Sequence, residues 1–218
     1  MSDMSHPFDL GAFIREIYNI DISSQPWYDQ VAHMAVVRQY KPGDLVQDLG
    51  EPIAEVRLLL DGTVRFFVMD YAGVVFTDCF LAERGYPINT HEFGMISGCG
   101  ISAMTDVSTV CLPLREMMPL LQTDPLLLSL QLGMSNWALQ FHWEQKVRRF
   151  RMNALQRYMM FKREYPQLDK RINSRYIAEY IGVAPESLSR LRKALRDGAG
   201  ENVFLPPDVV IRNKLSGD

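Results

Sequence analysis

The sequence lacks the features that mark several classes of protein. No apolar run reaches the roughly 18 residues of a membrane-spanning helix, because charged residues or proline interrupt each one. The first residues contain no basic segment followed by an apolar one, so we expect no secretory leader. Three cysteines, Cys79, Cys99 and Cys111, are an odd number without a CxxC pair. This usage favours reduced thiols and a cytoplasmic protein.

Local patterns of common enzymes are also lacking. The chain has no P-loop, no nucleophile elbow and no His and Cys set with metal-ligand spacing. We therefore predict that the protein is not an enzyme and holds no metal. His91, Cys79 and Cys99 are single candidates for a haem or metal ligand or a redox-sensitive thiol, although isolated residues of these types are more often structural.

Positive charge is scarce in the first part of the chain and abundant later. Residues 1–140 hold 7 Lys/Arg against 17 Asp/Glu, whereas residues 141–200 hold 14 against 6, within a net charge of −3. A basic region of this size indicates a polyanion as the partner of residues 141–200. The alternative is chance clustering of charge on solvated helices.

The first half of the chain has the periodicity of short strands. Two helical segments, residues 8–20 and 23–35, precede β-rich runs that turn signals separate between residues 36 and 113. This spacing predicts an antiparallel β-roll of about eight strands. Asp61 and Gly62 stand between two apolar runs, which predicts a hairpin there.

A long helix is predicted from about residue 124 to 151. Five apolar residues in it recur at alternating spacings of three and four, as in a coiled coil. We predict that they form a dimer interface, with packing inside one chain as the alternative. These residues are Leu127, Leu130, Met134, Trp137 and Phe141.

Residues 174–193, SRYIAEYIGVAPESLSRLRK, predict two short helices packed at a steep angle. Gly182 suits the positive φ of the tight turn, and Pro185 suits the first turn of the second helix. Glu186, Ser189, Arg190 and Lys193 share the outer face of that helix. We predict a helix-turn-helix with residues 185–196 as the recognition helix. The alternative is an ordinary helical hairpin.

The order of these parts resembles the Crp–Fnr family of bacterial transcription regulators. The motifs that carry this resemblance are YKPGDLVQDLG and LLLDGTVRFFVMDYAG in the roll, ALQRYMMFKREYPQL after the long helix, and IAEYIGVAPESLSRLRKAL in the helix-turn-helix. The resemblance implies an α+β fold with a cupin-like, cyclic-nucleotide-binding-like roll in residues 1–123, a dimerisation helix and hinge in 124–151, and a helix-turn-helix domain in 152–218. Residues 203–205 and 209–211 would form either a small wing or a packed terminal strand.

Site residues follow from this resemblance. Members contact bases through a Glu and an Arg four residues apart, here Glu186 and Arg190. Arginine can donate to guanine, glutamate can accept from cytosine, and Ser189 is small enough to approach a base edge. Three residues near helix ends are expected to contact phosphates: Ser174, Arg175 and Lys193. The implied partners are double-stranded DNA, a second copy of the chain and RNA polymerase, with no membrane partner.

The input signal is not evident from the sequence. Cyclic-nucleotide-binding members have a Gly-Glu pair and an Arg-Ser or Arg-Thr pair in a cassette that corresponds to residues 85–103, where neither pair occurs. Cyclic AMP is therefore not expected to bind in the usual way, since a buried anion needs such partners. Oxygen-sensing members of the family carry cysteines near the N-terminus for an iron–sulfur cluster, whereas the first cysteine here is Cys79, so such a cluster is not expected either. We predict no cofactor and an unidentified effector, or a constitutively active form.

A different class of function fits part of the pattern. The chain could be a small-molecule-binding signalling module whose helical C-terminal region contacts a protein. Affinity for DNA would fall steeply with salt concentration, whereas binding to a protein need not.

Overall fold

The structure, a computed structural model, describes residues 8–89, 95–198 and 203–205 of the 218-residue chain. It begins with helices α1 (Leu10–Tyr18) and α2 (Tyr28–Met34). Seven strands follow in the described residues: β1 (Val36–Tyr40), β2 (Leu45–Gln47), β3 (Glu55–Asp61), β4 (Val64–Met69), β5 (Val75–Leu81), β6 (Gly100–Ala103) and β7 (Val107–Pro113). The last elements are α3 (Leu114–Thr123), α4 (Pro125–Arg151), α5 (Ala154–Glu164), α6 (Ser174–Ile181) and α7 (Pro185–Arg196).

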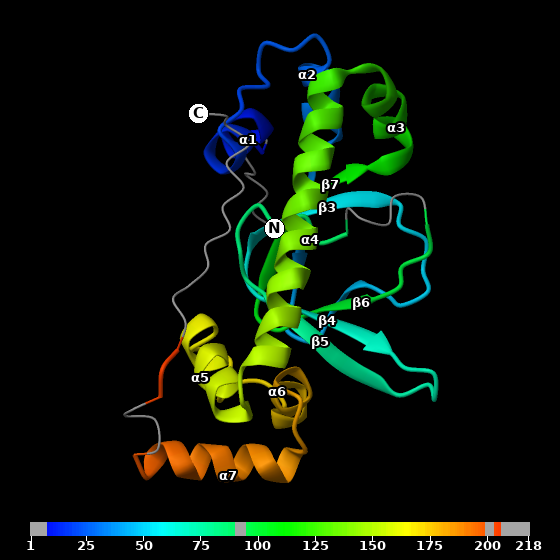
Figure 1. The fold of residues 1–218 in the computed structure, drawn as a ribbon. Helices are drawn as coiled ribbons and strands as arrows, with labels where there is room; N and C mark the ends of the chain where they lie inside the picture. The colour runs from blue at the N-terminus through cyan, green and yellow to red at the C-terminus, as the bar shows by residue number, and fades with distance from the viewer. Residues whose placement is uncertain (1–7, 90–94, 199–202, 206–218) are drawn as a thin grey trace, which may run out of the picture.

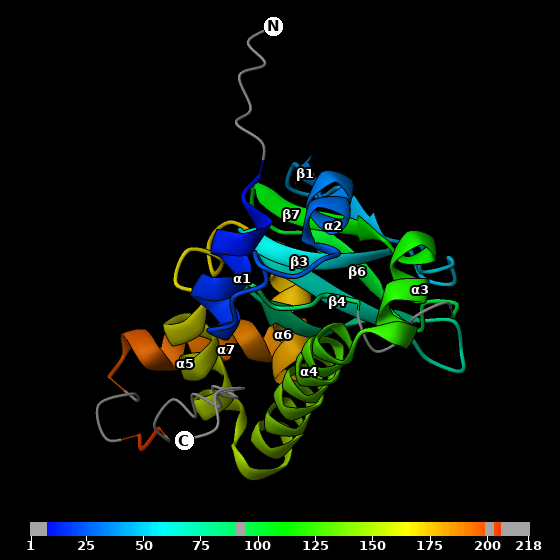
Figure 2. The same cartoon turned by 90° about the horizontal axis from the view of Figure 1, so that it is seen from above.

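The strands form two antiparallel sheets, with the orders β1-β7-β3 and β2-β6-β4-β5. Both sheets bury apolar side chains, and α1 and α2 lie against the sheet that contains β3 and β7 (Figure 2). The predicted α+β fold with an antiparallel roll is confirmed. The described part of the roll has seven strands, where the sequence predicted about eight.

The predicted hairpin at Asp61 and Gly62 is wrong. β3 pairs with β7, while β4 pairs with β5 and β6, so the turn carries the chain from one sheet to the other. Gly62 has φ +94°, and an added Cβ would lie 2.2 Å from the carbonyl oxygen of Asp106. The β4–β5 hairpin instead turns at Asp70, whose Oδ1 accepts hydrogen bonds from two backbone amides of the turn.

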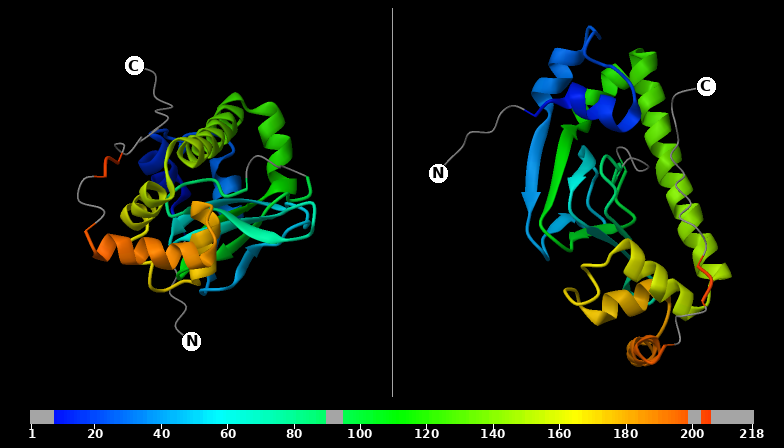
Figure 3. Two further views of the ribbon diagram at one scale, coloured as in Figure 1. Left: turned by 60° about the horizontal axis from the view of Figure 1, so that its bottom comes forward. Right: turned by 90° about the vertical axis from the view of Figure 1, so that its left-hand side faces the viewer.

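Helix α4 runs along the whole molecule, from α2 and α3 at one end to α5 and α6 at the other (Figure 1). Asp124 begins it by accepting hydrogen bonds from the amides of Leu126 and Leu127, and Pro125 occupies the first turn. The strands lie on one side of α4, and α5, α6 and α7 gather at one end (Figure 3). No helix in the described ranges has the length and apolarity to cross a membrane.

The roll and the C-terminal helices share one hydrophobic core. Phe80 of β5 packs against Phe161, Tyr165 and Tyr180, with ring centroids 5.5, 5.8 and 5.4 Å away. Tyr165 also donates a hydrogen bond to the carbonyl oxygen of Phe80 (2.6 Å). Because these side chains are buried, the helices are held firmly against the end of the roll.

Candidate nucleic-acid interface

Helices α6 and α7 form the predicted helix-turn-helix. Asn173 caps α6, and Gly182 ends it in the left-handed conformation, with φ 69° and ψ 46°. Its N–H donates to the carbonyls of Ala178 and Glu179, as expected of a glycine C-cap. Pro185 opens α7, which spans Pro185–Arg196 as predicted. Three apolar residues of the pair are fully buried: Ile177, Ile181 and Leu188.

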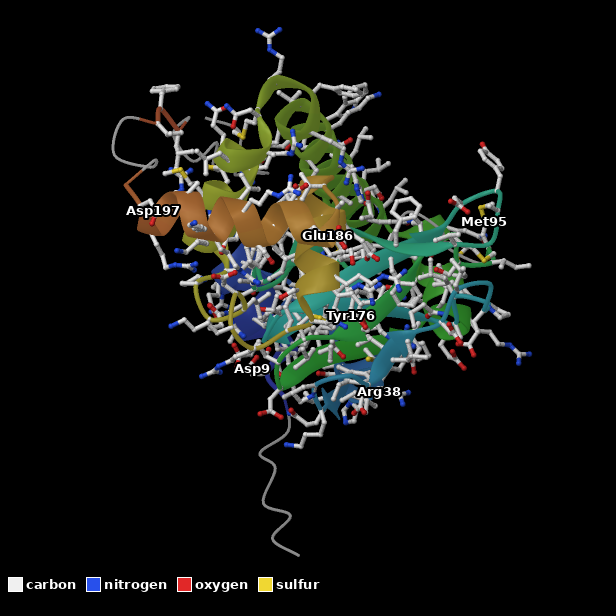
Figure 4. The ribbon with its side chains drawn as sticks, turned by 90° about the horizontal axis from the view of Figure 1, so that it is seen from below. Asp9, Arg38, Met95, Tyr176, Glu186 and Asp197 are labelled. Atoms are coloured by element: carbon white, nitrogen blue, oxygen red, sulfur yellow. The ribbon has the colours of Figure 1, made fainter. Side chains whose placement is uncertain are left out.

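The outer face of α7 is exposed along its length. Glu186, Ser189, Arg190 and Lys193 are all exposed, at the spacing that puts them on one face. Among the described residues, no side-chain hydrogen bond or ion pair engages any of the four. Figure 4 shows Glu186 on the underside of the molecule, on the face that α7 presents. The arrangement leaves donors and acceptors available to an external partner.

The other two predicted phosphate contacts are occupied within the chain. Ser174 Oγ accepts a hydrogen bond from Arg192 Nη1 (2.8 Å), and Arg175 Nε donates to Glu179 Oε1 (2.7 Å). Both residues are nevertheless exposed, so their outer surfaces face solvent. Lys193 differs from them because its ammonium group has no such partner in the described part of the chain.

Arg192 is a residue of this region that sequence reasoning missed. Its guanidinium donates to Asp169 Oδ1 (2.9 Å), to the Asp169 carbonyl and to the Tyr158 hydroxyl (3.2 Å), which fixes α7 to the loop before α6. Burial alone would lower the pKa of Arg192, but the hydrogen bonds to Asp169 and Tyr158 raise it. The side chain stays charged and positions helix α7.

A basic groove of about 610 Å³ lies beside α7. Arg192 forms part of its wall. Three further cations line it and were not predicted as site residues: Lys162, Lys170 and Arg196. The sequence indicated this basic region only through the net positive charge of residues 141–200. That charge predicted a negatively charged partner but did not identify which residues would contact it. The groove therefore places four basic side chains beside the exposed face of α7.

Helix α6 rests on strand β5 through Glu179. Glu179 Oε2 accepts hydrogen bonds from the Thr77 amide and the Thr77 hydroxyl, both at 2.8 Å. Burial would raise the pKa of Glu179, but the hydrogen bonds from Thr77 and Arg175 lower it. The carboxylate therefore stays ionised and holds the helix-turn-helix against the roll.

The junction between α4 and α5 is fixed by two arginines. Arg148 pairs with Glu144 and Glu164, and its side chain is 14% exposed. Arg157 donates to the carbonyl oxygens of Ile181 (2.7 Å) and Met152, which lie at the ends of α6 and α4. The hydrogen bonds of Arg157 satisfy carbonyl groups at helix ends. Together, the contacts of the two arginines fix the orientation of α5 and α6 relative to α4.

The predicted dimer seam of α4 needs correction, because its residues serve the core of their own chain. Leu127, Leu130 and Met134 are between 4% and 8% exposed and pack against α1, α3 and the roll. The ring of Trp137 contacts those of Tyr18 and Tyr86, and the ring of Phe141 contacts that of Tyr86. Packing within one chain, the alternative considered for this seam, accounts for Leu127, Leu130 and Met134, whereas Trp137 and Phe141 are only partly buried.

A second apolar stripe lies on the outer face of α4. Successive residues of this stripe are separated by three, four or seven positions, and these spacings place them on one side of the helix. Leu139 and Trp143 are each 55% exposed, and Phe150 is 76% exposed. The full stripe is Leu128, Leu132, Leu139, Trp143, Val147 and Phe150. Both stripes have coiled-coil spacing, so spacing alone did not show which one faces outward.

One group of potential metal ligands lies between the roll and α4 in the described residues. The ligand atoms of Asp78, Cys79 and His142 lie within 4.8 Å of one another, where β5 meets α4. However, Asp78 already pairs with Arg149, and burial raises the pKa of Cys79 well above its usual range. The thiolate that a metal needs is therefore disfavoured. Of the three single candidates, Cys79 is buried, Cys99 is partly buried, and His91 lies outside the described residues.

No family model matches the sequence, and no curated protein sequence matches it. Solved structures do match. FixK2 from Bradyrhizobium japonicum is 18% identical, with a TM-score of 0.63 over 76% of this chain and 86% of that chain. A crp/fnr-family transcriptional regulator from Eubacterium rectale is 13% identical, with a TM-score of 0.65 over 79% and 88%. A CRP/FNR-family transcriptional regulator from Thermus thermophilus is 19% identical, with a TM-score of 0.59 over 75% and 87%.

Proposed function

We propose that this chain, which has the fold of the Crp–Fnr regulators, is a sequence-specific DNA-binding transcription regulator that acts as a homodimer. The observation that carries the proposal is the exposed face of α7, where Glu186, Ser189, Arg190 and Lys193 have no partner in the described residues. A helix of this width, with polar side chains outward, fits the major groove.

Roles within the interface follow from side-chain chemistry. Arg190 would donate two hydrogen bonds to guanine, and Glu186 would accept one from cytosine. Lys193 and the cations of the groove beside α7 would contact phosphates, which position the helix without selecting a sequence. Two recognition helices related by a two-fold axis would bind half-sites about 34 Å apart.

The dimer would form through the outer stripe of α4. Six large apolar side chains exposed along one helix are more than a monomer normally leaves in water. A second copy of the same helix, packed in a coiled coil, would cover them. This interface differs from the one that the sequence predicted, because Leu127, Leu130 and Met134 are buried in the core of their own chain.

The effector of the roll would be a molecule other than cyclic AMP. Residues 85–103 lack the Gly-Glu pair and the Arg-Ser or Arg-Thr pair with which cyclic-nucleotide-binding members hold the ribose and the cyclic phosphate, and a buried anion needs such partners. RNA polymerase is the expected protein partner of a regulator of this kind.

The function is tested by selecting bound sequences from random duplex DNA, with the purified chain alone and with cell extract. We expect a pseudo-palindrome. Arg190→Ala should cost about 1–3 kcal/mol of specific binding and relax the preference at one position per half-site. Lys193→Ala should weaken all sequences alike and reduce the salt slope by about 1. Binding without any sequence preference, or with no salt dependence, would favour a protein-contacting module instead.

The dimer is tested separately by sedimentation. Leu139→Glu, in the middle of the outer stripe, should convert the dimer to monomer because it places a charge in the interface. Met118→Glu is the matched control, since Met118 is an exposed apolar residue on another helix, α3. A wild-type monomer, or a dimer that both variants retain, would refute this interface.

A further inference from the structure

A cleft of about 320 Å³ lies between the roll and the helical end of the molecule. Strands β2, β4 and β6 supply one wall, and the loop before α6, with the start of α6, supplies the other. Figure 4 shows Tyr176 where α6 crosses the strands, at this junction. The volume is that of a small-ligand pocket.

The cleft contains a buried arginine without a counter-ion. Arg65 is 7% exposed and lines the cleft. Within the ranges that the structure describes, no carboxylate lies within ion-pair distance of it. Burial lowers the pKa of Arg65, since the protonated form is poorly solvated there. A buried charge of this kind is costly unless something pairs with it.

The surroundings of Arg65 leave one edge of its guanidinium available. The ring of Tyr176 lies 3.8 Å from the guanidinium carbon, and the ring of Phe67 lies 4.9 Å from it. Nε donates to the Thr77 hydroxyl (2.8 Å). Aromatic contacts and this hydrogen bond fix the plane, and the two Nη groups have no partner in the described chain. A fixed guanidinium fork suits a carboxylate or phosphate.

Two further residues make the cleft electropositive and polar. Arg171 lines the cleft from the helical side and is exposed. Ser102 lines it from β6, and its hydroxyl is buried with no hydrogen-bond partner in the described part of the molecule. The nearby carboxylate of Glu179 is compensated by Thr77 and Arg175.

We propose that this cleft binds a small organic anion through one carboxylate or phosphate group, held by Arg65 and Arg171. The anion would connect the roll to the loop before α6. Thr77 would transmit its effect, because the same hydroxyl accepts from Arg65 and donates to Glu179 of α6. Any influence of the anion on DNA affinity rests on the proposed function, whereas the anion site itself does not.

The test is a titration of the ¹⁵N-arginine-labelled full chain with inorganic phosphate at constant ionic strength. The Arg65 Nε resonance, assigned from its loss in Arg65→Lys, should shift saturably at phosphate concentrations that leave solvent-exposed arginines unshifted. Arg171→Gln should raise the dissociation constant about threefold to tenfold. Arg115→Gln, an exposed arginine on α3, should leave it unchanged.

A non-saturating shift that follows those of the exposed arginines would overturn the proposal, as would equal binding by Arg171→Gln. A second titration uses duplex DNA. DNA that shifts Arg190 but leaves Arg65 unshifted supports a small anion, whereas DNA that shifts Arg65 and competes with phosphate would overturn that assignment. If Arg190 does not respond to DNA while phosphate saturates Arg65, the proposed function fails and the anion site stands.

Discussion

Replacing Glu179 with glutamine should weaken the contact between the helix-turn-helix and the roll. The carboxylate is 15% exposed and accepts hydrogen bonds from the Thr77 amide, the Thr77 hydroxyl and Arg175. Hydrogen bonds to charged groups contribute about 1.5–3 kcal/mol each. Glutamine keeps one acceptor oxygen but loses the charge, so we expect the free energy of unfolding to fall by about 1–3 kcal/mol.

The matched control is Glu186→Gln, the same chemical change on the neighbouring helix. Glu186 is exposed and has no side-chain partner among the described residues, so its replacement should change the free energy of unfolding by less than about 0.5 kcal/mol. Urea unfolding at pH 7 and fixed protein concentration measures both. Equal effects of the two variants would refute the role of Glu179.

Acidification provides a second check on Glu179. Its pKa is lowered in the folded protein from the ordinary value of 4.5. A carboxyl with a lowered folded-state pKa stabilises the protein above its unfolded-state pKa, and this contribution is lost as the pH falls through the folded-state pKa. The difference between wild type and Glu179→Gln should therefore stay constant above about pH 5 and shrink below it. A difference that grows on acidification would contradict the structure.

Other substitutions test packing and backbone geometry. Leu188→Ala should lower the free energy of unfolding by about 2–5 kcal/mol, because the side chain is fully buried between α6 and α7. Gly62→Ala should destabilise more than Gly73→Ala in thermal unfolding: both have positive φ, but only an added Cβ at Gly62 meets backbone at 2.2 Å. Arg148→Met should cost about 3–5 kcal/mol in urea unfolding, because it leaves two partly buried glutamates without their cation; a loss below about 1 kcal/mol would show that water replaces it.

The helix-turn-helix was predictable from sequence because its determinants are local. Gly182 ends α6 in a conformation that glycine adopts without strain, and Pro185 fits the first turn of α7. The end of α6, the start of α7 and the exposed face of α7 follow from such local signals. The same holds for Asp124, which begins α4 by capping its first amides.

The contacts that fix the helical end on the roll were not predictable in this way. Thr77 and Glu179 are 102 residues apart, and neither stands in a distinctive motif. The outer stripe of α4 was missed because two apolar stripes on one helix have nearly the same spacing, and only the position of the roll decides which is covered. Asp61 and Gly62 have hairpin chemistry, yet strand pairing is a property of the whole sheet.

The aromatic contacts of Phe80 with Phe161, Tyr165 and Tyr180 determine whether the roll and the C-terminal helices can fold independently of each other. Since Val46 in the roll and Leu188 on α7 belong to one continuous hydrophobic cluster, helices α5, α6 and α7 share their interior with the roll. We expect the two halves to melt in a single cooperative transition. A fragment beginning at α5 would expose Phe161, Tyr165 and Tyr180 and would aggregate rather than fold. Chimeras that exchange helices α5 to α7 with those of another protein of this fold would have to carry strand β5 along with them.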